Sequence, residues 1–221
     1  MQPPFRHPGR TSAVLLALFL LLLAPVAASW GPLDRADRDI VVSLHHSAVT
    51  HHGWTETARV LSDWVWDPWT MRALLALVVG WLLWRREWRL AVWVAATAAL
   101  GTLLQQGIKA AVGRERPHWP DPVDSAHYAA FPSGHALTAA VACGLVLWVM
   151  TLHGARDQWL RLMAVAGAVS VSGVGFTRLY LGVHWPSDVL GGWLLGAALV
   201  YAAAAAYPYT VRGGKPGEDG R

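Results

Sequence analysis

The feature that most constrains this chain is a series of long apolar stretches with almost no charged residues. A helix that crosses a lipid bilayer needs about 20 predominantly apolar residues, and the stretches here are close to that length. Charged residues make up only 14% of the 221 residues, whereas soluble domains carry about 25%. We therefore expect an all-α polytopic membrane protein with six transmembrane helices, at residues 12–30, 68–85, 89–110, 135–153, 159–177 and 188–207.

The remaining segments complete the expected organisation. Residues 1–11 form a cytoplasmic N-terminal segment, and residues 31–67 form a long connection on the outer side of a six-helix domain that spans 12–207. Residues 208–221 contain several glycines and prolines, a composition typical of a disordered tail. We therefore expect a single membrane domain that ends in a disordered cytoplasmic segment.

The first apolar stretch allows two interpretations. Arg6 and Arg10 precede it, and it ends in the small residues 27–29, so that it also resembles a cleavable signal peptide. Residues 1–28 are therefore either a retained helix or a signal. Under both interpretations, residues 31–67 lie on the outer side of the membrane.

The positions of the Lys and Arg residues orient the helices. With the N-terminus inside, the inner segments hold ten of these residues and the outer segments hold eight. The outer segment 31–67 combines three arginines with six acids, whereas the short connection at 85–89 has three arginines and one acid. Because positive charge in short loops marks the cytoplasmic side, we expect both termini in the cytoplasm of a plasma-membrane protein. The net charge of +4 does not indicate a nucleic-acid partner.

Three polar segments, at 109–117, 131–135 and 177–188, meet at the outer face if the six helices alternate in direction. Polar residues at the depth of the membrane are costly, and they indicate function by default. The same residues also have simpler explanations, namely a snorkelling cationic patch for the first segment and a helix cap for the second. The chemically capable side chains of these segments are Lys109, Arg114, Arg116, Ser133, His135, Arg178, His184 and Asp188.

The spacing within these segments indicates phosphate chemistry. Free N–H groups at Ser133, Gly134 and His135 would form an anion site at a helix start. Asp188 follows His184 by four residues, so its carboxylate can accept the Nδ1–H and turn the Nε2 lone pair outward. Cations would hold the equatorial oxygens of a phosphate ester, His184 would attack phosphorus, and His135 would protonate the leaving oxygen. The segments contain no carboxylate cluster for a divalent metal, so we expect metal-independent phosphoryl transfer without a cofactor.

Together the three segments resemble the signatures of the type 2 phosphatidic acid phosphatases, whose superfamily includes the vanadium haloperoxidases. The signature Lys-x6-Arg-Pro corresponds to Lys109–Pro117, and Pro-Ser-Gly-His corresponds to 132–135. The signature Ser-Arg-x5-His-x3-Asp corresponds to 177–188, with Thr177 in place of the usual Ser. Arg114 is not a signature position, and we expect it to make an auxiliary contact.

The resemblance implies roles for individual residues. His184 is expected to be the nucleophile that forms a phosphohistidine, with Asp188 to orient it and His135 to act as acid and then base. The phosphate-binding residues implied in the same way are Lys109, Arg116, Ser133, Gly134 and Arg178.

The resemblance also implies a lipid phosphate phosphatase that acts at the extracytoplasmic face of the membrane. Its substrate would be phosphatidic acid, phosphatidylglycerol phosphate or undecaprenyl pyrophosphate, and its oligomeric state is left open. A lipid phosphotransferase with the same site is the first alternative, since it would pass the phosphate to another acceptor. A channel or transporter is the second, and it would need polar residues throughout the membrane.

Two further features allow weaker predictions. Residues 31–67 contain His45, His46, His51 and His52, which could bind zinc, although a solvated or interfacial pair of helices is the simpler expectation. The loop at 118–130 connects two of the polar segments, so we expect it to cover the phosphate site.

Overall fold

The computed structural model describes residues 5–126 and 128–207, and within these residues all regular structure is helical. The expected all-α fold class is confirmed, whereas the tail at 208–221 lies outside the described residues. The elements are α1 (Pro8–Ala27), α2 (Gly31–Thr50), α3 (His52–Val60), the short π-helix η1 (Leu61–Val65), α4 (Pro68–Trp84), α5 (Trp88–Val112), α6 (Gly134–Leu152), α7 (Asp157–Tyr180) and α8 (Pro186–Ala206).

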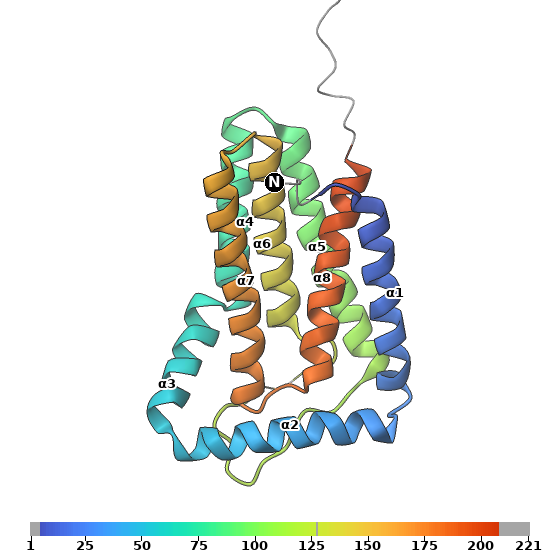
Figure 1. The fold of residues 1–221 in the computed structure, drawn as a ribbon, viewed down its shortest axis with the longest axis vertical. Coiled ribbons are helices and arrows are strands. Elements are labelled where there is room, and N and C mark those ends of the chain that lie inside the picture. The colour runs from blue at the N-terminus through green and yellow to red at the C-terminus, as the bar shows by residue number, and fades with distance from the viewer. Residues whose placement is uncertain (1–4, 127, 208–221) are drawn as a thin grey trace, which may run out of the picture.

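The helices α1 and α4 to α8 form an elongated bundle (Figure 1). Each expected apolar stretch is one of these helices, with ends that agree within a few residues. Among the described residues, five of them are long and apolar enough to cross a membrane, namely α1, α5, α6, α7 and α8. Helix α4 has 17 residues, which is at the lower limit of length for a span.

Close packing of α8 against α6 positions the two helix starts that carry the candidate site. A Cβ added to Gly192 would lie 2.6 Å from the carbonyl oxygen of Ser133, and one added to Gly196 would lie 2.9 Å from that of Leu137. Only glycine allows the two backbones to approach this closely. The start of α8 therefore lies directly against the start of α6, and the Ser133 N–H donates to the Asp188 carbonyl oxygen at 2.9 Å.

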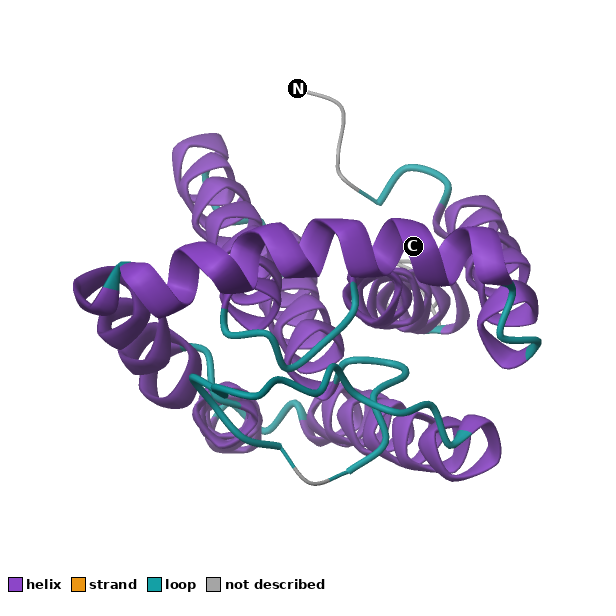
Figure 2. Ribbon diagram, turned by 90° about the horizontal axis from the view of Figure 1, so that it is seen from below, coloured by secondary structure: helices purple, strands orange, loops and turns teal. Residues whose placement is uncertain are grey.

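The segment 31–67 covers one end of the bundle. Helix α2 lies across this end, and α3 continues at an angle beside α7 (Figure 1). Seen from below, α2 crosses over the helix ends, beside the loops (Figure 2). The expected pair of helices in this segment is present. The beginning of α1 and the end of α8 lie at the opposite end of the bundle (Figure 1).

The outer surface of the bundle suits a lipid environment. Leu162, Val165, Val169 and Phe176 form an exposed apolar stripe along α7, at the spacing that places side chains on one helix face. Exposed tryptophans lie near the ends of the long helices, where an amphipathic ring is stable at the level of the head groups. They are Trp30, Trp69, Trp84, Trp88 and Trp159.

Candidate active site

His184 and Asp188 form a buried pair at the start of α8. Gly182, with a φ of +67°, turns the chain after α7, and Pro186 begins the new helix. Asp188 Oδ2 accepts the Trp185 N–H at 2.8 Å and lies 3.2 Å from His184 Nδ1. The two side chains are 2% and 0% exposed. The carboxylate thus caps its own helix and orients the imidazole, which is the arrangement that the spacing predicts.

His184 Nε2 points away from Asp188 and toward a guanidinium group. Arg116 Nη1 lies 3.1 Å from Nε2, and because Arg only donates hydrogen bonds, Nε2 is the acceptor and the proton is on Nδ1. Burial, followed by the positive charges of Arg116, Arg178 and Lys109, holds the pKa of His184 well below its usual range. The imidazole is therefore neutral at physiological pH, with an unprotonated Nε2.

Carbonyl groups of the loop between α5 and α6 hold two of the cations. Lys109 Nζ donates to the carbonyl oxygen of Ala129, and Arg116 Nε donates to that of Tyr128 at 2.5 Å. Burial, and next the charge of Arg178, lowers the pKa of Arg116 to about 10, so this side chain still carries a positive charge at neutral pH. The loop at 118–130 thus binds two of the cations through the carbonyl groups of Tyr128 and Ala129.

His135 lies in the first turn of α6 and is half-buried. Ser133 is the N-cap of this helix. The expectation of a free Ser133 N–H is wrong, because that group donates to the Asp188 carbonyl oxygen in the close contact between α6 and α8. An anion at this helix start can therefore use the N–H groups of Gly134 and His135, which precede the first intrahelical bond.

Arg178, at the end of α7, is surrounded by residues that the sequence did not link to it. Its Nη1 donates to Ser62 Oγ at 2.8 Å, and the Asp124 and Asp63 carboxylates lie 3.5 and 3.7 Å away. Its Nε is buried and has no hydrogen-bond partner among the described residues. Burial and then the negative charge of Asp124 raise the pKa of Asp63, although the charge of Arg178 opposes this. Arg178 thus keeps a buried donor available for a ligand.

Arg114 binds the oxygen of Asp188 that does not face His184, and it also contacts other acids. Its Nη1 donates to Asp188 Oδ1 at 2.8 Å and to Ser187 Oγ at 2.6 Å, and its Nη2 donates to Asp37 Oδ2 at 2.8 Å. Burial favours a lower pKa for Arg114, but the charge of Asp188 and the hydrogen bonds to Asp37 and Asp188 outweigh it and raise the pKa. Sequence reasoning missed Asp37 and Ser187 altogether.

His45 and Trp119 join α2 to the loop before α6. The two rings stack with centroids 3.9 Å apart, and Trp119 Nε1 donates to the Gly182 carbonyl oxygen at 2.8 Å. His45 Nε2 lies 3.4 Å from Asp121 Oδ1, whereas His51 Nδ1, just after α2, is 2.9 Å from the carbonyl oxygen of Ser47 in the last turn of that helix. Within the described ranges, no three His, Cys, Asp or Glu side chains are grouped as metal ligands. In the structure, His45 packs on Trp119 and His51 lies at the end of α2.

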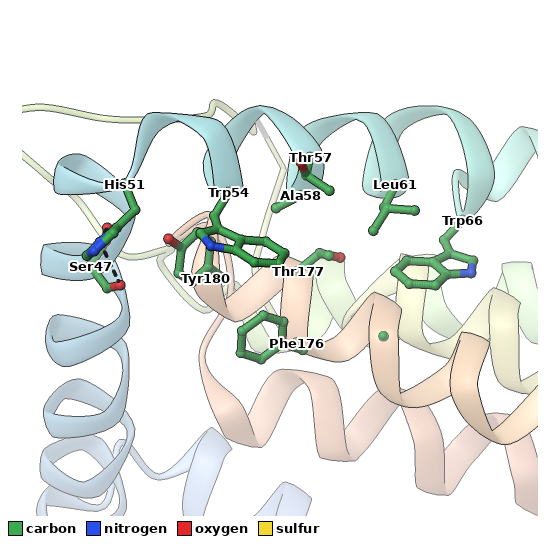
Figure 3. Close-up of a pocket in the computed structure, with 11 residues that line it drawn as sticks. Ser47, His51, Trp54, Thr57, Ala58, Leu61, Trp66, Phe176, Thr177 and Tyr180 are labelled. Atoms are coloured by element: carbon green, nitrogen blue, oxygen red, sulfur yellow. Dashed lines mark hydrogen bonds between the residues drawn. The ribbon is translucent and has the colours of Figure 1, made fainter.

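An apolar cleft of about 560 Å³ lies between α7 and the segment formed by α3 and η1 (Figure 3). Trp66 packs so closely on Gly173 that an added Cβ would lie 2.2 Å from the indole ring. Phe176 brings the exposed stripe of α7 into the cleft. The residues that line it are Ser47, His51, Trp54, Thr57, Ala58, Leu61, Trp66, Gly173, Phe176, Thr177 and Tyr180.

A second cleft, of about 460 Å³, opens between α1, α2 and the loop that follows α5. Polar and charged side chains dominate its lining, including Arg38, Arg114, Arg116 and His118. Arg116 therefore faces this polar cleft and also contacts His184. The apolar cleft thus includes Thr177, the residue before Arg178, and the polar cleft is lined in part by Arg116.

This fold and site define a multi-pass helical membrane protein with a buried His–Asp pair and a cationic cluster at one end. The chain belongs to the PAP2 superfamily, because the model of that family matches residues 90–212. This match covers more than half of the chain and includes all three polar segments. The protein is therefore a member of a family of phosphatases.

Named relatives support this membership. An undecaprenyl-diphosphatase of Sulfolobus acidocaldarius is 31% identical over 196 residues, which cover 83% of this chain and 85% of the relative. Phosphatidylglycerophosphatase B of Bacillus subtilis is 31% identical over 134 residues, or 58% of this chain and 64% of the relative. A decaprenylphosphoryl-5-phosphoribose phosphatase of Mycobacterium tuberculosis is 32% identical over 170 residues, or 75% and 87%.

A solved structure has the same fold. The crystal structure of a transmembrane PAP2-type phosphatidylglycerolphosphate phosphatase from Bacillus subtilis matches with a TM-score of 0.78. The alignment covers 88% of this chain and 94% of the other, at 23% sequence identity. At this sequence identity, the match shows a shared fold and nothing more.

Proposed function

We propose that this protein hydrolyses the phosphate or pyrophosphate head group of a membrane lipid through a phosphohistidine on His184. The observation that carries the proposal is the position of His184 Nε2, which is unprotonated and in contact with Arg116. Asp188 orients the ring through the opposite nitrogen, Nδ1. A nucleophile needs an available lone pair and a positioned partner, and this geometry supplies both. The named relatives are all phosphatases.

The proposed first step transfers the phosphoryl group to the enzyme. His184 Nε2 attacks phosphorus, the bond between phosphorus and the leaving oxygen breaks, and His135 gives that oxygen a proton. Asp188 accepts the Nδ1–H throughout and stabilises the positive charge that develops on the ring. Lys109, Arg116 and Arg178 hold the equatorial oxygens of the transition state, and the N–H groups at Gly134 and His135 add donors from the helix start.

The second step returns the free enzyme. His135, now unprotonated, takes a proton from a water molecule that attacks phosphorus, and the bond from phosphorus to Nε2 breaks to release inorganic phosphate. In this proposal the reaction is independent of metals, since three cationic side chains neutralise the phosphate. The polar cleft beside Arg116 is a route for the water molecule and for the product.

We place the site at the extracytoplasmic face of the plasma membrane. With α4 as the sixth span, the beginning of α1 and the end of α8 share the side opposite to α2, as the ribbon suggests (Figure 1). Arg85, Arg86 and Arg89 lie in the short connection between α4 and α5, on that same side. Because cytoplasmic loops are rich in Arg and Lys, both termini would be cytoplasmic.

The apolar cleft supports a lipid substrate. It begins where the exposed stripe of α7 ends at Phe176, so a hydrocarbon chain can pass from the bilayer into the cleft along one helix face. Leu61 in the wall of the cleft is next to Ser62, which accepts a hydrogen bond from Arg178. A chain in the cleft would therefore place its head group near the cations. Phosphatidic acid, phosphatidylglycerol phosphate and undecaprenyl pyrophosphate all have this amphiphilic form.

The decisive experiment measures phosphate release by the purified protein in detergent, with and without EDTA, from these three lipids. The wild type is expected to release phosphate from at least one of them, and His184→Ala is expected to abolish turnover. His153→Ala is the matched control, because His153 contacts Glu87 at the other end of the bundle. Full activity of His184→Ala refutes the nucleophile, and loss of all wild-type activity in EDTA refutes metal independence. Turnover that requires an added acceptor indicates a phosphotransferase.

A further inference from the structure

Helix α2 carries a buried carboxylate that the proposed reaction does not use. Asp37 is only 2% exposed, although two residues further on Asp39 is exposed to solvent. A buried carboxylate is costly unless charged or hydrogen-bonding partners compensate for the lost water. Asp37 therefore stays buried because specific partners hold it.

The partners of Asp37 all belong to the candidate site. Its Oδ1 accepts the Ser187 N–H at 2.9 Å, and its Oδ2 accepts the Ser187 hydroxyl at 2.5 Å and Arg114 Nη2 at 2.8 Å. Ser187 is in the first turn of α8, next to Asp188. A single side chain of α2 thus binds both the backbone of that turn and the guanidinium that contacts Asp188.

Arg114 connects the two carboxylates. Its planar guanidinium donates from Nη1 to Asp188 Oδ1 and from Nη2 to Asp37 Oδ2, both at 2.8 Å, and Asp34 Oδ1 lies 3.2 Å from Nη2. The N–H groups of a planar guanidinium point in fixed directions, so Arg114 sets the direction of each of these hydrogen bonds. With Oδ1 held by Arg114, the second oxygen of Asp188 faces His184 Nδ1 and the Trp185 N–H.

The charges also explain why a second acid is needed. Arg116 contacts His184, and the charges of Arg178 and Lys109 also lower the pKa of His184. Arg114 adds a fourth cation, which contacts Asp188. Asp37 and Asp34 offset that cation from the side of α2. The contact of Arg114 with Asp188 therefore adds little net positive charge beside His184.

We propose that Asp37 and Arg114 are positioning residues, through which helix α2 fixes the carboxylate of Asp188 and hence the tautomer and direction of His184. This inference rests on the proposed function of His184 as the nucleophile. Asp37 lies outside the part of the chain that the family model matches, which begins at residue 90. The positioning acid thus comes from the segment that covers the end of the bundle.

The kinetic test uses Asp37→Asn, Arg114→Lys and the control Asp39→Asn in the full chain. Displacement of a reacting group by about 1 Å can cost a factor of about 100 in rate, so kcat is expected to fall about 10- to 100-fold in the first two variants, with KM within a factor of about 3. Asp39→Asn is expected to behave as the wild type. Unchanged kcat in Asp37→Asn, with correctly folded protein, overturns the proposal.

A second measurement is independent of turnover. Histidine-selective ¹⁵N NMR reports which ring nitrogen carries the proton, and His184→Gln identifies the His184 signal by its loss. The wild type is expected to show the proton fixed on Nδ1, and Asp37→Asn is expected to show a mixture of tautomers. The same Nδ1–H signal in both proteins overturns the positioning role even if no lipid in the panel is a substrate. If the wild type releases no phosphate from any of the lipids but the expected NMR difference is observed, the proposed function is contradicted and the positioning role is retained.

Discussion

Arg116 Nη1 lies 3.1 Å from His184 Nε2, so the candidate nucleophile accepts a hydrogen bond from a cation. An incoming phosphate can replace this contact, because its oxygens accept the Arg116 N–H groups while phosphorus faces Nε2. The same cation opposes protonation of the imidazole. Arg116 is therefore expected both to bind the substrate and to keep the nucleophile in its reactive, neutral form.

This double role predicts a change in the pH profile of Arg116→Gln. The pKa of His184 is held well below its usual range by burial first and by Arg116 next, and an ordinary His titrates near about 6.5. The wild type is expected to retain neutral His184 as the pH falls through 6. Removal of the Arg116 charge raises the pKa, so that the acid limb of kcat/KM begins at a higher pH. Profiles measured with one substrate for wild type, Arg116→Gln and the exposed-site control Arg35→Gln check this, and identical acid limbs contradict it.

Thr177, which replaces the usual Ser of the family signature, predicts a small effect on catalysis. Its hydroxyl donates to the Val174 carbonyl oxygen of its own helix at 3.0 Å and is buried. The hydroxyl is thus bonded within α7. Thr177→Ser is expected to keep kcat/KM within about a factor of 2, and Thr177→Val is expected to lose about 1 kcal/mol of stability with little loss of activity. A fall of two orders of magnitude in Thr177→Val, measured with the same lipid, would assign the hydroxyl to the phosphate.

The local parts of the site could be predicted from sequence. His184 and Asp188 are four residues apart across a helix start, and Pro186 marks where that helix begins, so their contact follows from helix geometry. The long apolar stretches likewise predict the positions of the bundle helices. The convergence of the three polar segments follows once the helices alternate in direction.

The long-range partners could not be predicted. Arg114 and Asp37 are 77 positions apart, and Arg178 and Ser62 are 116 apart, so no spacing rule links them. One signal was available in α2, where Asp37, Val41, His45 and Ala48 form the buried face. An acid on the apolar face of an amphipathic helix indicates a buried partner. The bond from Ser133 to Asp188 depends on how closely α6 and α8 pack, which sequence alone does not specify.

The contact of Gly192 with α6 predicts that Gly192→Ala damages both stability and the site. The added Cβ would lie 2.6 Å from the Ser133 carbonyl oxygen and 3.0 Å from the Leu137 nitrogen, which are backbone atoms that cannot turn aside. Overpacking of this kind costs about 1–3 kcal/mol, and the separation of α8 from α6 also displaces Asp188 from Ser133. A lower midpoint of thermal unfolding in detergent, together with reduced kcat, is expected.

Gly80→Ala is the matched control for this variant. Gly80 is within α4, near its C-terminal end, and a Cβ added there has nothing within 4 Å. Because alanine favours a helix over glycine by about 1 kcal/mol, this variant is expected to unfold at the same or a higher temperature. Equal stability of Gly192→Ala and the wild type would mean that α6 and α8 are not held at this distance.

The apolar cleft predicts that Ala58→Phe discriminates between substrates by chain length. Ala58 lines the cleft opposite α7 (Figure 3), so a phenyl ring fills space that a hydrocarbon chain would otherwise occupy. The KM for a long-chain phosphatidate is expected to rise about 10-fold, the equivalent of about 1.4 kcal/mol of lost binding, because the long chain loses its apolar contacts. A dihexanoyl phosphatidate does not need the whole cleft, so its kcat and KM should remain near the wild-type values.

Val165→Phe separates this effect from a general change in the membrane-facing surface. Val165 is exposed on the same stripe of α7, outside the cleft, so the larger ring there should leave both substrates unaffected. Equal increases in KM for the short and long lipids in Ala58→Phe would point to a disturbed phosphate site, since Leu61 in the lining of the cleft precedes Ser62, which binds Arg178. An increase confined to the long-chain lipid places the hydrocarbon chain between α3 and α7.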